Sequence, residues 1–271
     1  LRTDRTGALI DMTVFVFRLA VCLAAILCAS PSMAQWEEDW LVREPRFDET
    51  GRMIVDVELV FAVDVSSSID EEEALRQRQG HVAALADPDV ISAIEAGGEG
   101  RIAVLYIEWA DSGFQRIVAP WTLIEGPEDA EMFAGTLAAA PFVSGRRTAI
   151  GAVINSAVQL IETNGYSGRR LVIDISGDGP QNAGPPLTDA RAAADAAGVT
   201  INGLPIQSSR QDPFRPPVNI DVARYFENHV IAGPGSFVMR SETHEDFVTA
   251  LRRKLIVEIA GLSPAALSSD G

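Results

Sequence analysis

Apolar and polar positions along this chain form short segments that predict strands alternating with helices. Strand-length runs, either continuously apolar or alternating in polarity, cover residues 54–65, 101–109, 114–121, 170–176, 199–206 and 236–240. Stretches with helical spacing and helix-start residues cover residues 71–86, 128–139, 149–162, 188–197, 220–228 and 244–258. This order is typical of an α/β, Rossmann-like fold, in which a mostly parallel central sheet carries helices on both faces.

One pair of strands departs from the parallel pattern. Residues 101–109 and 114–121 are joined by a hairpin-sized link, so we expect one antiparallel strand at an edge of the sheet. The sequence contains no internal repeat and no second apolar core, which predicts a single domain at residues 54–258. A polar lead-in, residues 35–53, precedes this domain, and a small, polar and flexible tail, residues 259–271, follows it.

The first residues have the pattern of an export signal. From Met12, a possible true start, Arg18 precedes an apolar run at residues 19–29, and a small-x-small cleavage site ends at Ala34. We therefore expect residues 1–34 to be a signal peptide, so that the mature protein is periplasmic or secreted. An uncleaved membrane anchor is the alternative, although Arg18 leaves an apolar run that is short for a membrane span. We expect no membrane span in the mature chain.

Composition excludes several classes of function. Both cysteines, Cys22 and Cys28, lie in the signal segment, so the mature chain has no thiol for disulfides, catalysis or metal binding. The chain carries 38 acidic and 22 basic residues, a formal net charge of -16. This balance argues against nucleic acid and against anionic membranes as partners, because both require a basic surface.

Oxygen-bearing side chains follow two of the predicted strands and precede a predicted helix. Asp64, Ser66 and Ser68 lie at the end of the first strand, Asp178 lies just past the strand at residues 170–176, and Thr148 lies at a loop-to-helix junction. Ligands of open α/β sheets bind outside the carboxyl ends of the strands. If these two strands are central neighbours, the five side chains converge on one crevice.

This set of side chains suits a hard divalent cation. Two carboxylates and three hydroxyls, without histidine or cysteine, are the ligands expected for Mg²⁺, Mn²⁺ or Ca²⁺. Neutral hydroxyls leave the charge of the cation only partly compensated, so an acidic group from outside could complete the shell. The composition of the set favours binding over hydrolysis.

Each part of this set also has an ordinary structural interpretation. Residues 68–71 form a capping box for the following helix, with Ser68 as the N-cap. Thr148 could be the N-cap of the next helix, and Asp178 with Gly179 could form a simple turn. Their joint occurrence at these positions of one α/β chain is what favours the metal site.

The order Asp64-x-Ser66-x-Ser68, then Thr148, then Asp178 resembles a von Willebrand factor type A (VWA) domain with a metal-ion-dependent adhesion site (MIDAS). The resemblance covers residues 54–258 and is strongest to uncharacterised exported VWA-like proteins of proteobacteria. It implies a cation held directly by the hydroxyls of Ser66, Ser68 and Thr148. It also implies that Asp64 and Asp178 act largely through water and that a Glu or Asp of a protein partner fills the sixth position.

We therefore expect an exported, non-enzymatic binding module that uses a divalent cation, such as Mg²⁺, to bind an acidic group of a protein partner. One alternative is a metal-dependent hydrolase that acts on a phosphorylated or carboxylate substrate. Another is a metal-free interaction scaffold in which the motif serves only as helix caps.

Three features depart from a minimal VWA pattern. The Pro-rich loop at residues 208–217 is long. Asp174 interrupts an apolar strand, where it is expected to pair with Arg169 or Arg170 or to face a polar neighbour. Asn182 could hold the loop that carries Asp178, although a plain turn role is equally compatible with the sequence.

Overall fold

The computed structural model describes residues 43–206, 220–241 and 244–262 of the 271-residue chain. The chain separates into two compact units, Leu1–Glu44 and Pro45–Gly271, and all elements below belong to the second. The predicted signal peptide, the Pro-rich loop at residues 208–217 and most of the predicted tail lie outside the described residues. Among the helices of the described ranges, none is both long and apolar enough for a membrane crossing.

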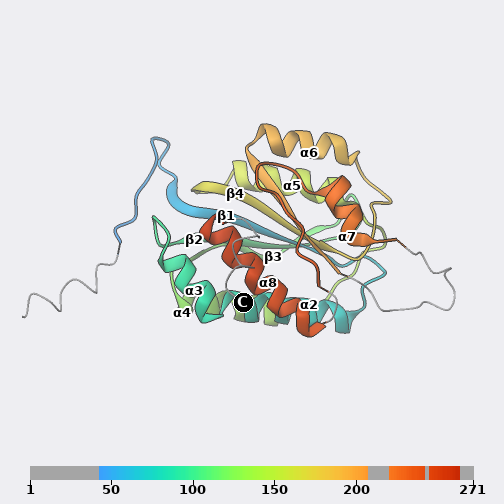
Figure 1. Cartoon of the computed structure of the whole chain (residues 1–271), viewed down its shortest axis with the longest axis horizontal. Helices are drawn as coiled ribbons and strands as arrows, with labels where there is room; N and C mark the ends of the chain where they lie inside the picture. The colour runs from blue at the N-terminus through green and yellow to red at the C-terminus, as the bar shows by residue number, and fades with distance from the viewer. Residues whose placement is uncertain (1–42, 207–219, 242–243, 263–271) are drawn as a thin grey trace, which may run out of the picture. The chain divides into compact units, whose positions relative to one another are not determined.

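A five-stranded sheet forms the centre of this unit, in the order β3-β2-β1-β4-β5 (Figure 1). Its strands are β1 (Met53–Asp64), β2 (Ile102–Trp109), β3 (Gln115–Ile124), β4 (Tyr166–Gly177) and β5 (Val199–Pro205). β1 pairs in parallel with β2 and β4, and β4 with β5, whereas β3 runs antiparallel beside β2. The predicted α/β fold with one antiparallel edge strand is therefore confirmed, and β1 and β4 are neighbours.

Helices cover both faces of the sheet (Figure 1). One face packs against α2 (Glu71–Leu85), α3 (Pro88–Glu95), α4 (Pro127–Ala139) and α8 (His244–Ala260). The other packs against α5 (Ile150–Glu162), α6 (Leu187–Ala196), α7 (Val222–Tyr225) and the π-helical turn η3 (Phe226–Val230). Phe61 of β1 enters the first core and its neighbour Ala62 enters the second, so β1 is a continuous apolar run because it is buried on both faces.

A helix that the sequence analysis did not predict begins directly after α2. Asp87 and Pro88 end the helix expected at residues 71–86, but Pro88 then occupies the first turn of α3, where its missing N–H has no cost. The side chain of Asp87 is the N-cap and accepts a hydrogen bond from the N–H of Asp89 at 2.9 Å. These residues therefore join two helices.

The strand predicted at residues 236–240 is wrong in its extent. This segment forms a single isolated bridge to β5, which joins Gly203 to Val238. The N–H of Phe237 donates instead to the side-chain Oδ1 of Asn202 at 3.0 Å, so a side chain of β5 replaces a ladder hydrogen bond. The helix predicted at residues 220–228 is present as α7 followed by η3.

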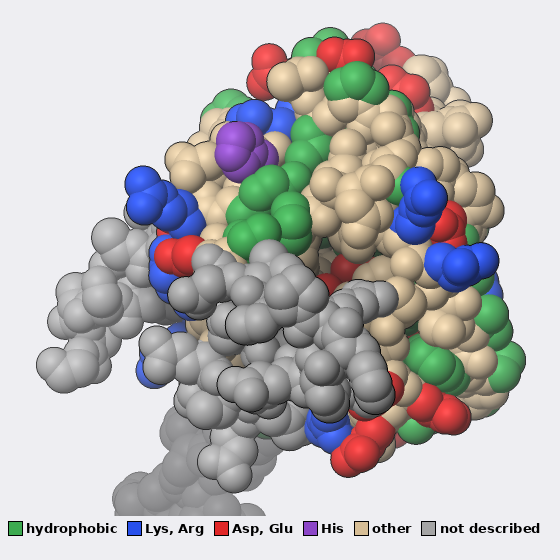
Figure 2. Space-filling model, turned by 90° about the vertical axis from the view of Figure 1, so that its right-hand side faces the viewer, with side chains coloured by type: hydrophobic (Ala, Val, Ile, Leu, Met, Phe, Trp, Pro, Cys, Tyr) green, Lys and Arg blue, Asp and Glu red, His purple; other side chains and the backbone are tan. Residues whose placement is uncertain are grey.

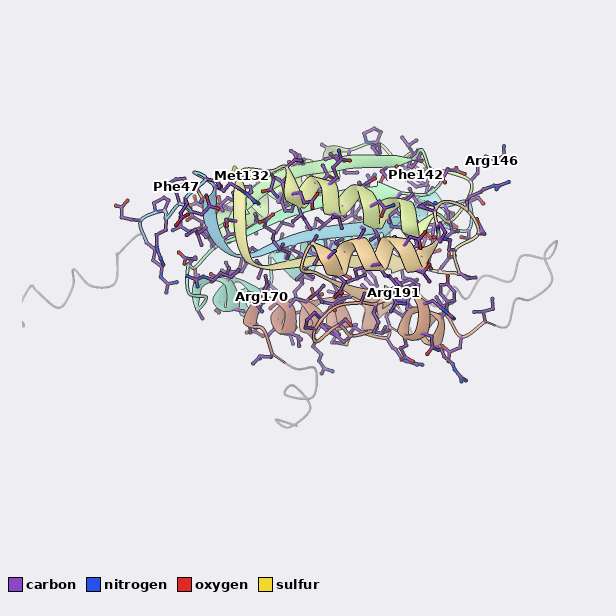
Figure 3. All side chains as sticks on the ribbon, turned by 90° about the horizontal axis from the view of Figure 1, so that it is seen from above. Phe47, Met132, Phe142, Arg146, Arg170 and Arg191 are labelled. Atoms are coloured by element: carbon purple, nitrogen blue, oxygen red, sulfur yellow. The ribbon has the colours of Figure 1, made fainter. Side chains whose placement is uncertain are left out.

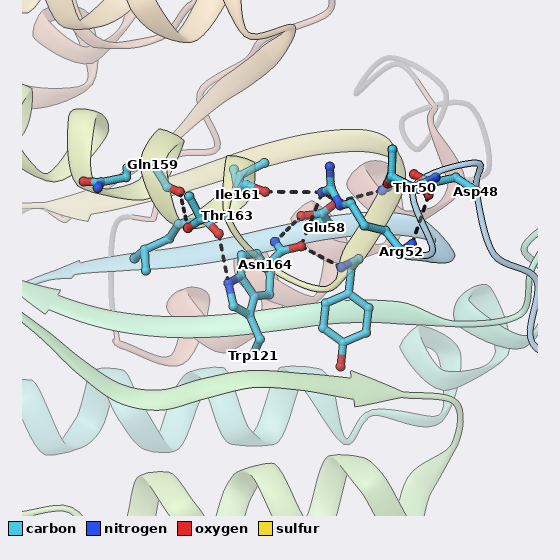
Figure 4. A network of polar contacts seen from close by, with 12 residues as sticks. Asp48, Thr50, Arg52, Glu58, Trp121, Gln159, Ile161, Thr163 and Asn164 are labelled. Atoms are coloured by element: carbon cyan, nitrogen blue, oxygen red, sulfur yellow. Dashed lines mark hydrogen bonds and ion pairs between the residues drawn. The ribbon is translucent and has the colours of Figure 1, made fainter.

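A buried carboxylate closes the amino-terminal end of the sheet. Glu58 of β1 is fully buried and accepts hydrogen bonds from the N–H of Gly168, at 2.7 Å, and from the side chain of Asn164 (Figure 4). Burial raises the pKa of the Glu58 carboxyl, and the Arg52 guanidinium lies 3.5 Å from it. This network ties the start of β4 to β1, at the end of the sheet away from Asp64.

Candidate functional site

The carboxyl ends of β1 and β4 bring Asp64 and Asp178 to the same edge of the sheet. β1 and β4 pair in parallel up to Val63 and Ser176, so Asp64 ends β1 while Asp178 follows β4 directly. Figure 2 shows the surface of the side that lies at the right of Figure 1, where β1 ends. A shared crevice was expected if these two strands were central neighbours, and β1 and β4 are neighbours.

A chain of short hydrogen bonds links four of the five predicted residues. Oδ1 of Asp64 accepts a bond from the N–H of Ser66 at 2.7 Å, which turns the loop after β1 back on itself. The hydroxyls of Ser66 and Ser68 lie 3.1 Å apart. The Ser68 hydroxyl in turn donates to Oδ1 of Asp178 at 2.9 Å. Asp64, Ser66, Ser68 and Asp178 therefore form one contiguous cluster of oxygen atoms.

Thr148 is brought beside this cluster by the loop between α4 and α5. The N–H of Gly145 donates to the carbonyl of Val65 at 2.9 Å, and the Ser67 hydroxyl donates to the carbonyl of Arg146 at 3.0 Å. A Cβ at position 145 would overlap the side chain of Ala110, so this close approach requires glycine. The loop that ends at Thr148 is thus fastened to the loop that carries the two serines.

Asn182 fastens the Asp178 loop to Thr148. The N–H of Thr148 donates to Oδ1 of Asn182 at 3.0 Å, and the N–H of Asn182 donates to the Thr148 carbonyl at 2.9 Å. The neighbouring Gln181 accepts a bond from the N–H of Gly151, in the first turn of α5, at 2.7 Å. Of the two roles left open for Asn182, holding the loop is the one that the structure shows.

Neither hydroxyl suspected of capping a helix does so. The N-cap of α2 is Asp70, whose side chain accepts a bond from the N–H of Glu73 at 2.8 Å, so the capping box predicted for Ser68 is wrong. The N-cap of α5 is Ala149, which makes no side-chain capping bond, so Thr148 is not the cap either. The interpretation of these two residues as helix caps is therefore excluded. The Ser68 hydroxyl bonds within the cluster, and the Thr148 hydroxyl accepts a bond from the side-chain amide of Asn182 at 3.5 Å.

The electrostatics of the cluster fit a bound cation. Asp64 is fully buried, and its Oδ2 has no hydrogen-bond partner among the described residues. Burial, and next the charge of Asp178, raise the pKa of the Asp64 carboxyl well above its ordinary value. An unsatisfied buried carboxylate oxygen is costly unless a positive group faces it. Ser68 and Asp178 are partly exposed, so the cluster opens to the surface.

Only two acidic side chains contribute to the cluster. Within the described ranges, no group of three or more His, Cys, Asp or Glu side chains is close enough together to hold a metal ion. Cation binding at Asp64 and Asp178 would therefore depend on the hydroxyls of Ser66, Ser68 and Thr148. These are the side chains that the sequence predicts as cation ligands, and their binding of a cation stays a prediction.

Sequence reasoning missed a buried ion network that supports the Thr148 loop. Glu108 of β2 is fully buried and pairs with Arg78 of α2 and with Arg116 of β3, whose nearest atoms lie 2.6 and 2.5 Å away. Both guanidinium groups also donate to main-chain carbonyls at the start of the α4–α5 loop, Arg78 to Ala140 and Arg116 to Pro141. A glutamate inside the apolar segment at residues 101–109 was the signal that could have pointed to this network.

The partner of Asp174 is a lysine, which corrects the expected pairing with Arg169 or Arg170. Lys254 of α8, fully buried, lies 2.9 Å from Asp174 and also pairs with Glu258. Arg169 pairs with Glu99, and Arg170 donates to the last carbonyls of α8. Burial raises the pKa of Glu258 to about 7, against the opposing effect of Lys254.

Histidine does not contribute to the cluster in the described ranges. His81 is buried between the rings of Phe61, Tyr106 and Phe247, so it is a core residue. His229 of η3 contacts the ring of Tyr225, the last residue of α7. The side chain of His244 lies outside the described residues.

Comparison with protein families identifies this fold and motif. Residues 54–263, most of the chain, match the model of the family described as "Protein of unknown function (DUF1194)". The chain belongs to the DUF1194 family. Among curated proteins, no match to this DUF1194 member is found.

Solved structures show that the DUF1194 fold is VWA-like. The mussel byssus protein proximal thread matrix protein 1 (PTMP1) is 15% identical, with a TM-score of 0.54 over 76% of this chain and 48% of PTMP1. Another PTMP1 structure, with a TM-score of 0.51 at the same identity and coverage, has a zinc-occupied MIDAS motif. A von Willebrand factor type A structure from Catenulispora acidiphila is 15% identical, with a TM-score of 0.51 over 77% of this chain and 43% of its own.

At these identities the likeness shows the fold alone. The chain spans less than half the length of these relatives, at 48% and 43%. The zinc ion is therefore a property of PTMP1, and what the oxygen cluster of this chain holds has to be argued from its own residues.

Proposed function

We propose that this protein is an exported binding module that holds a divalent cation, such as Mg²⁺, in the Asp64 cluster and uses it to bind a carboxylate of a protein partner. The observation that carries the proposal is the buried Oδ2 of Asp64, which has no hydrogen-bond partner among the described residues although the hydroxyls of Ser66 and Ser68 and the carboxylate of Asp178 belong to the same cluster. A bound cation would compensate the negative charge of the Asp64 carboxylate. The PTMP1 structure with zinc in its MIDAS motif supports the same use of the fold.

Each residue of the cluster has a separate role in this proposal. The hydroxyls of Ser66, Ser68 and Thr148 would hold the cation as neutral ligands, while Asp64 and Asp178 supply the negative charge. A cation held in this way would offer an open coordination position to a partner's Glu or Asp. Asp64 also accepts the N–H of Ser66, so the same carboxylate orients the serine loop.

Binding, and not hydrolysis, suits this donor set. Neutral hydroxyls compensate little of the cation's charge, so the open position retains affinity for an anion. A hydrolase would need a general base within hydrogen-bond reach of the attacking water. The described histidines His81 and His229 lie among aromatic rings elsewhere. Export, proposed from the signal pattern of residues 1–34, would place the cluster where millimolar divalent cations and surface proteins are available.

Isothermal titration of Mg²⁺, Mn²⁺ and Ca²⁺ into the purified protein tests the cation site. We expect saturable binding at one site, lost in Asp64→Asn and in Thr148→Val, both of which nearly preserve side-chain shape. Asp195→Asn and Thr136→Val are matched controls, because both residues are exposed on helices outside the cluster. Equal binding by Asp64→Asn and the wild type would contradict the proposal.

Partner chemistry is tested with small carboxylates. If the wild type binds no cation alone, the titration is repeated with acetate or glutamate at millimolar concentration. Cation binding that appears only with the carboxylate would mean that the partner's group completes the site. Absence of binding under both conditions would leave a metal-free scaffold and refute the proposal.

A further inference from the structure

Two arginines whose guanidinium groups have no partner among the described residues precede Thr148 of the candidate site. Arg146 and Arg147 immediately precede Thr148, and both are exposed. Neither guanidinium makes a hydrogen bond or an ion pair with any described residue, whereas Arg78, Arg116 and Arg252 all pair with carboxylates. In Figure 3, Arg146 points away from the protein at the carboxyl edge of the sheet. In a chain of net charge -16, two adjacent arginines without a partner among the described residues, directly before Thr148, form a local positive charge beside the site.

The main chain beneath these arginines is held firmly, so their position relative to the cluster is defined. The N–H of Arg146 donates to Oδ2 of Asp111 at 2.8 Å, and its carbonyl accepts the Ser67 hydroxyl at 3.0 Å. Ser67 lies between the two serines of the cluster. The arginines are therefore attached to a fixed rim beside the cation site, with only their side chains free to move.

The start of α2, which follows the serine loop, has the opposite charge. α2 begins with Glu71, Glu72 and Glu73, directly after the serine loop, and the charge of Glu73 contributes to the raised pKa of Asp64. An anionic partner that extended over the start of α2 would meet like charges. A partner that extended over the α4–α5 loop would meet two guanidinium groups, which bind carboxylates with paired hydrogen bonds.

We propose that the partner presents an acidic segment with at least two carboxylates, of which one binds the cation and a neighbouring one binds Arg146 and Arg147. This inference rests on the proposed function. It adds that the ligand carries more than one carboxylate and that it extends from the cation over the α4–α5 loop. A long polyanion, such as nucleic acid, would also cross the acidic start of α2. A short run of Glu or Asp in a protein is the ligand that matches one cation flanked by two arginines on one side.

The test compares four peptides that differ only in charge. Acetylated and amidated Gly-Glu-Glu-Gly is titrated into the Mg²⁺-saturated protein beside Gly-Glu-Gln-Gly, Gly-Gln-Glu-Gly and Gly-Gln-Gln-Gly. We expect the Glu-Glu peptide to bind about 1.4-fold to fivefold more tightly than the better single-Glu peptide, the range expected of exposed charge pairs. This preference should shrink as salt rises from about 50 to 500 mM, because screening weakens exposed pairs.

Variants of the arginines separate this inference from the proposed function. Arg146→Gln with Arg147→Gln should retain Mg²⁺ affinity and single-Glu binding, but bind the Glu-Glu peptide no better than a single-Glu peptide. Arg253→Gln is the control, because Arg253 is exposed on α8 and pairs with no described residue. The Arg253→Gln variant should keep the full preference for the Glu-Glu peptide.

Each outcome of these titrations either supports or overturns the inference about the acidic segment. Equal binding of the Glu-Glu and single-Glu peptides by the wild type, or an unchanged preference in the double variant, would overturn the inference and leave the cation site standing. No Mg²⁺ binding and no peptide binding by the wild type would overturn the proposed function and this inference with it. Loss of Mg²⁺ binding in the double variant would show that the arginines support the cation loop and do not select the partner.

Discussion

Thr148 and Asn182 hold each other through three hydrogen bonds. The N–H of Thr148 donates to Oδ1 of Asn182 at 3.0 Å, the N–H of Asn182 donates to the Thr148 carbonyl at 2.9 Å, and Nδ2 of Asn182 donates to the Thr148 hydroxyl at 3.5 Å. This pair joins the loop after β4, which carries Asp178, to the start of α5. Two parts of the cluster that are far apart in sequence are therefore placed by one amide side chain.

Replacing Asn182 with Ala should lower cation affinity more than it lowers stability. Loss of an outer residue that orients a metal ligand typically costs about 10- to 100-fold in affinity. Loss of one hydrogen bond costs about 1 kcal/mol of unfolding free energy. Calorimetric titration and thermal unfolding measure both effects. Asn228→Ala, at an exposed amide that bonds only to the carbonyl of Arg224, should change neither.

Cation binding should raise thermal stability through the same site. At about 100 times the dissociation constant, a ligand that binds only the folded state adds about 2.7 kcal/mol. Added Mg²⁺ should therefore raise the Tm, and EDTA should reverse the shift. Asp64→Asn should show no shift. A shift of equal size in that variant would place the cation elsewhere.

Gly145→Ala should destabilise the Thr148 loop because its new Cβ overlaps the side chain of Ala110. Overpacking of this kind costs about 1–3 kcal/mol. Adding Ala110→Gly removes the overlapping atom, so the double variant should recover stability relative to Gly145→Ala. Chemical denaturation measures both. Failure of the second substitution to rescue the first would mean that the backbone at position 145 requires glycine for another reason.

Arg78→Met should be strongly destabilising, by about 3 kcal/mol, because it leaves the buried Glu108 with only its partly exposed partner Arg116. Arg76→Met is the control, since Arg76 forms an exposed pair with Glu72 one turn away and should lose less than about 0.5 kcal/mol. Urea unfolding gives both values. Similar losses would show that Glu108 is compensated without Arg78.

Glu258 should make stability depend on pH near neutrality. Its pKa is raised to about 7 by burial, with Asp174 raising it and Lys254 lowering it, from an ordinary value of 4.5. Because the folded state binds this proton more tightly than the unfolded state, the contribution is complete at acidic pH and is lost as pH rises through 7. The slope is at most about 1.4 kcal/mol per pH unit.

The measurement is the difference in Tm between the wild type and Glu258→Gln from pH 5 to 8. Use of a difference removes the effects of other groups, among them His81, whose pKa is lowered by burial and which acts in the opposite direction. The wild type should lose stability relative to the variant as pH rises. A constant difference would mean that Lys254 keeps Glu258 ionised throughout.

Most of the fold could be predicted because its signals are local. β1 and β2 were expected within about one residue of their bounds, since strands buried on both faces consist of continuous apolar residues. α3 was missed because Pro88 was interpreted only as the end of the preceding helix, whereas it is also the first residue of α3. The segment at residues 236–240 has the alternation of a strand, but the side chain of Asn202 takes the N–H that a strand would have given to the ladder.

The five oxygen-bearing candidate residues could be named from their order and from their places, four of them at or after strand ends and Thr148 at a loop-to-helix junction. The residues that hold the loops of the cluster in place could not be predicted from the sequence. Arg78 and Glu108 are 30 positions apart, and Asn182 is 34 positions from Thr148, so no local pattern links them. The lysine that neutralises Asp174 lies on the last helix, whereas the nearest cations in sequence, Arg169 and Arg170, have other partners.

The sequence by itself determined the α/β class, the order of the elements and the identity of the candidate cation ligands, because apolar periodicity and donor chemistry belong to individual segments. Only the tertiary structure decided that Ser68 and Thr148 are not helix caps, that Oδ2 of Asp64 is left without a partner among the described residues, and that Arg146 and Arg147 flank the cluster. These properties depend on which segments come into contact and on which polar atoms then lack a hydrogen-bond partner. Both are decided only when the chain folds.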